Sequence, residues 1–252
     1  MRNYFLLILV LPVFFGSCKK PNETDPSYTL EAYQELGMPD YNTVWSMTDY
    51  KDAYYALVKL KYEKPFALPA RESEKSGELF SRIINLENLS FLQDETLPLH
   101  EKARIIMEYL NIHSDYMDVY TNLRMKKQYY ARELVDIDIF GIRIAQKMLD
   151  LGNEINQSED PGDVAMQSGF SSIQKMYLTF LTDMLEKQQH TSQYPEKTLE
   201  LLCDTLSNSI RRNMEWFDED ASEEIKQGMH AVIDSTSSQR IKTDYRDLIE
   251  VL

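Results

Sequence analysis

The chain has 252 residues and carries 27 basic against 41 acidic side chains, a net charge of −14. An acidic surface repels the phosphates of nucleic acids and of anionic lipid headgroups, so neither is an expected partner. The chain has only eight glycines and two cysteines. Few chain breakers favour long helices over the many turns of an all-β domain, and so few cysteines leave stability to a packed core.

The first predicted element is an apolar leader. Arg2 precedes an uncharged run from Tyr4 to Phe15. This run falls within the roughly 7–15 residues of a signal-peptide core and is shorter than the about 20 residues that span a bilayer. Two small residues, Gly16 and Ser17, and then Cys18 follow. We therefore predict that residues 1–17 are a signal peptide.

These residues resemble the lipobox of bacterial lipoprotein precursors, in which an aliphatic residue and two small residues precede an invariant Cys. Phe15 stands where Leu is usual. The resemblance implies that Cys18 is acylated and becomes the N-terminus of a lipid-anchored protein of the cell envelope. Lys19 and Lys20 after the Cys favour the outer membrane by that family's sorting rules. Cleavage by the ordinary signal peptidase and an uncleaved anchor remain alternatives.

Residues 18–28 are polar and contain two prolines, which predicts a flexible tether. Residues 29–252 are predicted to form one all-α domain, a helical bundle. Its first elements are a short helix with a loop, a helix from Thr48 or Asp49 to Glu63, and a helix that begins near Ser73 or Ser76 and continues through Leu92.

Residues 98–151 contain no Gly or Pro between Pro98 and Gly141. They form either one long helix or two, and we favour a break near residue 121. The part from Leu123 to about Leu151 has apolar stripes on two faces, which predicts the centre of the bundle. The alternation of Val135 to Ile139 also fits a strand, but the helical period extends further. Gly152 is expected to end this helix.

Four further helices are predicted after residue 152. Asp160 and Pro161 are typical of an N-cap and first helical position, and the apolar stripe of this helix extends to Met184. Pro195 begins a helix whose stripe includes Phe217. Asp220 and Glu223 resemble a capping box for the next helix. A short amphipathic helix from Ile241 ends the chain.

No catalytic, cofactor or metal-binding motif is present. The four histidines do not form a His-Glu-x-x-His pattern, and no Gly-rich phosphate loop or nucleophile elbow occurs. His113 and Cys203 lie on apolar helical stripes, so we expect them in the core. No catalytic residue, metal ligand or cofactor is therefore predicted.

One charged group stands out on the central helix. Arg132, Asp136 and Arg143 project within about 40° of one another at helical pitch, while Asp138 points elsewhere among apolar neighbours. The favoured interpretation is an internal ion-pair ladder. The alternative is a polar pocket in which Arg132 and Arg143 bind an anionic group.

Three functional hypotheses follow. The favoured one is a non-catalytic envelope lipoprotein that interacts with or scaffolds another envelope protein. The membrane is then a second partner, reached through acyl chains on Cys18. The alternative is a helical lipoprotein that binds a ligand near Arg132 and Arg143, for which the 16 tyrosines offer support. A second alternative is an enzyme with a site made of carboxylates only.

Overall fold

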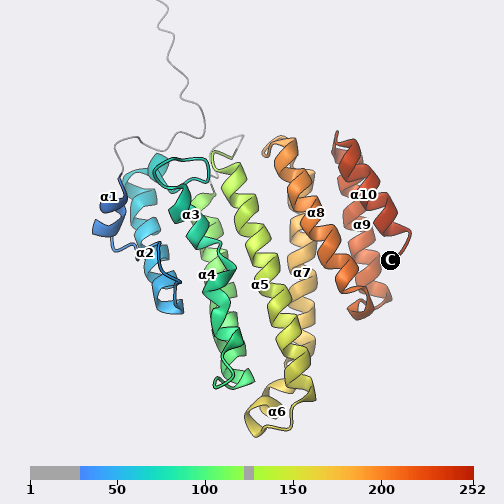
Figure 1. Cartoon of the computed structure of the whole chain (residues 1–252). Helices are drawn as coiled ribbons and strands as arrows, with labels where there is room; N and C mark the ends of the chain where they lie inside the picture. Colours follow the sequence, from blue (N-terminus) through green and yellow to red (C-terminus); the bar gives the residue numbers. More distant parts are fainter. Residues whose placement is uncertain (1–28, 122–127) are drawn as a thin grey trace, which may run out of the picture.

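The computed structural model describes residues 29–121 and 128–252. The predicted signal peptide, Cys18 and the tether lie outside these residues. Every regular element in the described part is a helix (Figure 1), and its buried apolar side chains form one core. This confirms the all-α bundle. The strand alternative for Val135 to Ile139 is wrong because these residues lie inside a long helix.

The N-terminal part contains the predicted short helix. The helix predicted from Ser73 or Ser76 through Leu92 is divided into two elements. The elements of the N-terminal part are α1 (Leu30–Glu35), α2 (Met47–Glu63), the 3-10 helix η1 (Pro65–Ala67), α3 (Gly77–Ile83) and the 3-10 helix η2 (Leu86–Gln93). Ser46 and Asp49 form a capping box at the start of α2. The helix predicted through Leu92 is interrupted because the Asn85 side chain caps η2, accepting a hydrogen bond from the Glu87 amide at 2.9 Å.

Residues 98–151 form parts of two helices, α4 (Leu99–Tyr120) and α5 (Ala131–Gln157). Thr121 has an extended backbone, so the break predicted near residue 121 is confirmed. The predicted start at Leu123 is wrong for residues 128–130, which are not helical. The predicted end at Gly152 is also wrong. A Cβ at Gly152 would lie 2.6 Å from Cε2 of Phe170, so this glycine allows a neighbouring helix to approach.

Helix α5 is the centre of the molecule, as predicted. It packs against α4, α6 (Pro161–Gln167), α7 (Phe170–Gln189) and α8 (Glu196–Arg212). Figure 1 shows α1 to α4 on one side of α5 and α7 to α10 on the other, with α6 at the lower end. Its buried side chains extend from Ala131 to Ile155. A helix that is apolar on more than one face gains stability only when it is covered on each of them.

The C-terminal part contains α6, α7, α8, the 3-10 helix η3 (Met214–Trp216), α9 (Glu219–Ser235) and α10 (Gln239–Ile249). Asp160 caps α6 as predicted, but the helix ends at Gln167 and a new one begins at Phe170. The helix predicted through Phe217 ends at Arg212. The capping box at Asp220 is wrong, because Asp218 accepts the hydrogen bond from the Ala221 amide at 2.8 Å.

Buried tyrosines connect the helices to the loops of the N-terminal part. The hydroxyl of Tyr109 donates to the Asn88 carbonyl at 3.1 Å, and that of Tyr120 donates to the Pro69 carbonyl at 2.9 Å. Much of the tyrosine content therefore belongs to the core and gives no support to a ligand site. None of the described helices combines the length and the apolar character needed to cross a membrane.

Candidate functional site

The three charged residues predicted on one face of α5 line a single hollow with a volume of about 260 Å³. Arg71, from the loop before α3, lies in the same hollow. Asp136 is 4% exposed, and its Oδ2 accepts hydrogen bonds from Arg71 at 2.6 Å and from Nε of Arg132 at 3.1 Å. Sequence spacing predicted the contact with Arg132. It carried no signal for Arg71, which comes from a distant segment.

Arg143 differs from the other two arginines. It is exposed and forms no ion pair or hydrogen bond with any residue in the described ranges. The ion-pair interpretation therefore holds for Arg132 and Asp136 but not for Arg143. A guanidinium at the edge of a hollow, with all its donors available, is suited to bind a carboxylate or a phosphate.

The hollow is one end of a longer groove along α5. Arg143 also lines a second hollow of about 340 Å³, and this shares Leu86 and Lys147 with a third of about 600 Å³. The α5 residues that line the three extend from Arg132 to Glu154, which is about 33 Å at 1.5 Å per residue. Helix α8 forms one wall of the first two hollows, and residues 71–86 line their other side. The third hollow lies between α5, η2 and Lys102 of α4.

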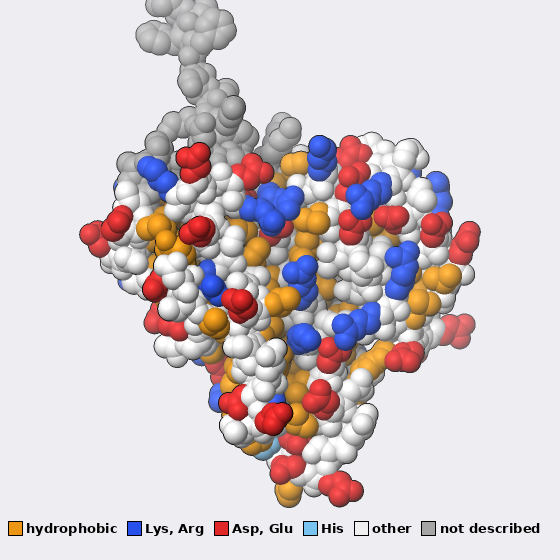
Figure 2. All heavy atoms as spheres, viewed as in Figure 1, with side chains coloured by type: hydrophobic (Ala, Val, Ile, Leu, Met, Phe, Trp, Pro, Cys, Tyr) orange, Lys and Arg blue, Asp and Glu red, His pale blue; other side chains and the backbone are white. Residues whose placement is uncertain are grey.

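The groove is basic although the protein is acidic. Its lining includes six basic and four acidic side chains, against a net charge of −14 for the whole chain. The basic excess lies in the first two hollows, because the lining of the third has two basic and three acidic side chains. Figure 2 shows Lys and Arg side chains in the middle of this face, over α5 and α8. Arg212 is held by both oxygens of Asp150 at 3.0 Å. Lys147, like Arg143, is exposed and has no ion pair within the described part of the chain.

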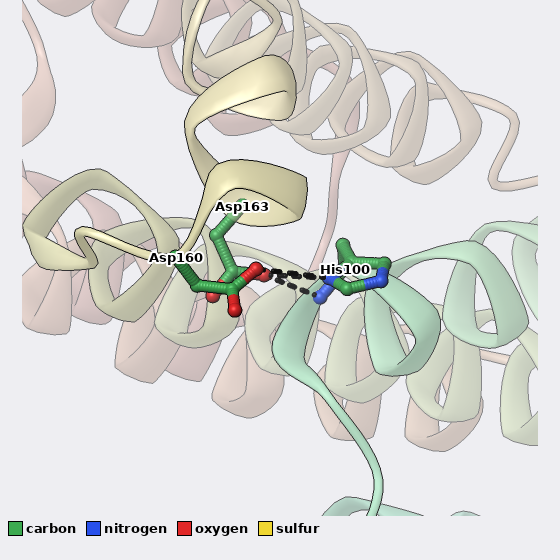
Figure 3. A group of neighbouring side chains, drawn as sticks. All are labelled: His100, Asp160 and Asp163. Atoms are coloured by element: carbon green, nitrogen blue, oxygen red, sulfur yellow. Dashed lines mark hydrogen bonds and ion pairs between the residues drawn. The ribbon is translucent and has the colours of Figure 1, made fainter.

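A second polar cluster, shown in Figure 3, joins the start of α4 to the start of α6. It contains His100, Asp160 and Asp163, whose ligand atoms lie within 4.8 Å of one another. Asp163 Oδ1 accepts from the His100 amide at 2.9 Å and lies 3.0 Å from its Nδ1, while Oδ2 accepts from the Ser158 hydroxyl at 2.7 Å. Asp160 caps the Gly162 amide at 2.8 Å.

These bonds explain the cluster as a connection between two helices. Burial raises the pKa of Asp163, but hydrogen bonds from Ser158 and His100 outweigh it and leave the pKa below its usual value. A charged carboxylate that accepts three hydrogen bonds fixes the position of α6 against α4. Sequence spacing carries no signal for this connection, since His100 and Asp163 come from separate helices.

His113 and Cys203 have the core positions that the sequence predicted. Nε2 of His113 lies 2.8 Å from the Ile137 carbonyl, and burial lowers the pKa of the imidazole to about 4. Burial raises the pKa of the Cys203 thiol to about 11. A thiol with this pKa is protonated at neutral pH and is therefore a poor nucleophile.

Together, the fold and the groove define an all-α protein with a basic groove on an acidic surface. Comparison of the chain with protein-family models, with curated proteins and with solved structures finds no match. The functional argument therefore depends on the geometry of the groove.

Proposed function

We propose that this protein is a lipid-anchored, non-catalytic protein of the cell envelope that docks an acidic segment of another envelope protein in the groove along α5. The basic character of the groove supports this proposal most directly. An extended segment rises about 3.3 Å per residue, so about ten residues fill a groove of about 33 Å. Carboxylates of the segment would bind Arg143 and Lys147, which line the groove and form no ion pair with any described residue.

The chemistry of the groove favours binding over catalysis. Its most buried carboxylate, Asp136, is neutralised by two arginines and is therefore a poor general base. Arginines on the floor and apolar side chains on the walls, among them Leu86 and Leu201, suit contact with a peptide. The hypothesis of a carboxylate-only enzyme remains a prediction without support from this groove.

Binding of a labelled ten-residue peptide of alternating Glu and Ala tests the docking proposal by fluorescence anisotropy. We expect the double variant Arg143→Glu and Lys147→Glu to weaken binding by about tenfold or more, because two attractive contacts become repulsive. Both side chains are exposed and form no ion pair with the described part of the chain, so the variant should fold normally.

The matched control is the double variant Lys59→Glu and Lys226→Glu, which makes the same charge change on α2 and α9 outside the groove. We expect it to bind the peptide nearly as well as the parent. Equal losses in both double variants would show that net charge alone drives binding and would reject the groove as the site.

A second candidate function is specific to the hollow at one end of the groove. Three arginines and one carboxylate in about 260 Å³ suit a single small anion. Titration with inorganic phosphate distinguishes the two functions. If phosphate binds with the same dependence on Arg143 and a two-residue acidic peptide binds as well as the ten-residue one, the ligand is a small anion and the docking proposal is wrong.

The membrane anchor is tested independently of the groove. Metabolic labelling with a fatty acid should mark the native chain but not the Cys18→Ser variant, because the resemblance to a lipobox assigns the acyl chain to this thiol. The variant should also leave the membrane fraction. Unchanged labelling and fractionation would show that the chain is not a lipoprotein anchored at Cys18.

A further inference from the structure

A separate cavity of about 420 Å³ lies between α4, α5 and α7. It is on the side of α5 opposite the groove, because Asp138 and Asp136 are about 200° apart around a helix. The walls are mainly apolar and include flexible side chains that adapt their shape to a ligand. These apolar wall residues are Leu110, Met117, Met176, Phe180 and Met184.

The buried end of the cavity holds an unusual carboxylate. Asp138 is fully buried, and its Oδ2 accepts a hydrogen bond from Nζ of Lys187 at 2.5 Å. Its Oδ1 is buried and has no hydrogen-bond partner among residues 29–121 and 128–252. An unpaired buried oxygen of a charged group is costly, so a ligand that donates a hydrogen bond to it gains binding energy.

A second acceptor lies in the same lining. Nε2 of His113 lies 2.8 Å from the Ile137 carbonyl, which can only accept, so Nε2 carries the proton. Because burial keeps the ring neutral, Nδ1 has an unshared pair of electrons. No residue within the described part of the chain donates a hydrogen bond to it. The His113 ring can lie this close to α5 because residue 141 is a glycine. A Cβ at Gly141 would overlap both His113 and Phe180.

The charges of the cavity select the sign of the ligand. Asp138 and Asp183 contribute two negative charges and Lys187 one positive charge. Asp183 is exposed and makes no ion pair or hydrogen bond with the residues that the structure describes. The cavity thus has a net negative charge and more acceptors than donors, which disfavours an anion and favours a cation with several N–H groups.

We propose that this cavity binds a small organic amine, with its protonated amino group at Asp138, attracted also by the charge of Asp183, and its apolar part against the methionines and Phe180. A primary ammonium has three donors, enough for both unused acceptors, Asp138 Oδ1 and Nδ1 of His113, while the Asp183 carboxylate adds electrostatic attraction. The proposal does not depend on the groove, since the two sites lie on opposite faces of α5.

Calorimetric titration with n-octylamine tests the proposal, with n-octanol and n-octanoate as ligands of the same chain length. The protein is the chain from residue 18 onward with Cys18→Ser, which contains the whole described core. The pH is at least one unit above the Asp138 pKa of about 6. We expect octylamine to bind about tenfold or more tightly than octanol, because octanol offers one uncharged donor and the ammonium three charged ones. Octanoate should bind least, because it has no donor and carries a negative charge.

The location is tested with variants and with methionine methyl NMR signals. Asp183→Asn should weaken octylamine binding by about fivefold or more and leave octanol binding unchanged. Glu186→Gln removes the same charge on α7 from a residue outside the lining and is the matched control. Octylamine should shift the methyl signals of Met176 and Met184 but not that of Met229, which is buried in α9.

Three results would overturn the proposal. They are octanoate binding as tightly as octylamine, equal effects of Asp183→Asn and Glu186→Gln, and methyl shifts that avoid Met176 and Met184. Asp183 is at the exposed edge of the cavity, so its variant should fold even if changes at the buried Asp138 do not.

Discussion

Two tyrosines of one buried cluster differ in a single hydrogen bond. The rings of Tyr50 and Tyr116 lie 4.7 Å apart, and both residues are fully buried. The Tyr116 hydroxyl donates to the Tyr50 carbonyl at 2.9 Å, whereas the Tyr50 hydroxyl has no hydrogen-bond partner among the residues that the structure describes. The same chemical group is therefore satisfied in one residue and unsatisfied in the other.

This difference predicts opposite effects of the same substitution. Tyr50→Phe should raise the free energy of unfolding by about 1 kcal/mol, because it removes an unsatisfied buried hydroxyl. Tyr116→Phe should lower it by about 1 kcal/mol, because it removes a hydrogen bond that is made. Urea unfolding measures both changes. Losses of the same size in the two variants would show that the Tyr50 hydroxyl is satisfied in solution.

His113 predicts a pH dependence with a definite sign. Its folded pKa of about 4 lies below the ordinary 6.5, so the unfolded chain takes up a proton first as the pH falls. Its contribution to stability is present above pH 6.5 and is lost towards pH 4. Asp138 acts in the opposite direction, because burial raises its pKa from 3.8 to about 6 and its protonation favours the folded state.

The two contributions are separated by the variant His113→Gln, which cannot titrate. Relative to the parent, its free energy of unfolding should increase as the pH falls from 6.5 to 4, by on the order of 3 kcal/mol. Urea unfolding at several pH values gives the difference between the two proteins. A difference that is constant with pH would contradict the buried, neutral imidazole.

At the scale of helices, the sequence predicts that a helix exists more reliably than it predicts the residues at which the helix begins and ends. Apolar periodicity identified the long helices and the central position of α5, because the burial of a stripe is encoded within each segment. Apolar periodicity did not predict the end of a helix where a contact with a distant segment determines that end. Gly152 looks like a helix terminator, but its role is to admit the ring of Phe170 from α7.

The same distinction applies to the candidate site. Helical pitch alone places Arg132, Asp136 and Arg143 on one face of α5. Arg71 and the wall formed by α8 could not be predicted, because they depend on how separate segments pack. The groove forms only when separate segments pack together. The sequence of α5 alone predicts the one side of the groove that this helix supplies.

Gly141 provides a test of close packing around α5. In an isolated helix, Gly141→Ala should add up to about 1 kcal/mol of stability through helix propensity. Here the new Cβ would lie 2.6 Å from Cζ of Phe180 and would also overlap His113. We therefore expect a net loss of about 2 kcal/mol from overpacking. Thermal unfolding measures this loss, and a variant as stable as the parent would contradict the packing described.

The whole molecule separates two chemical environments on the two sides of α5. One side has a groove with more basic than acidic lining residues, and the other has a mainly apolar cavity with a net negative charge. Both lie in a protein with a net charge of −14. The surroundings of the groove therefore oppose acidic ligands at long range, and its local charges must overcome this repulsion.

This charge distribution predicts opposite responses of stability and binding to salt. Raising the ionic strength from about 0.01 M to about 0.1 M shortens the Debye length from about 30 Å to about 10 Å. The melting temperature should rise, because screening reduces repulsion among the excess acidic side chains. The affinity of the groove for the Glu-Ala peptide should fall when the ionic strength is raised further, from about 0.1 M to about 1 M. The long-range repulsion is already screened at about 0.1 M, and the Debye length then shortens to about 3 Å and weakens the exposed contacts with Arg143 and Lys147. Scanning calorimetry and anisotropy on the same samples measure both responses. A peptide affinity that does not change with salt would mean that the apolar walls, and not the basic floor, hold the segment.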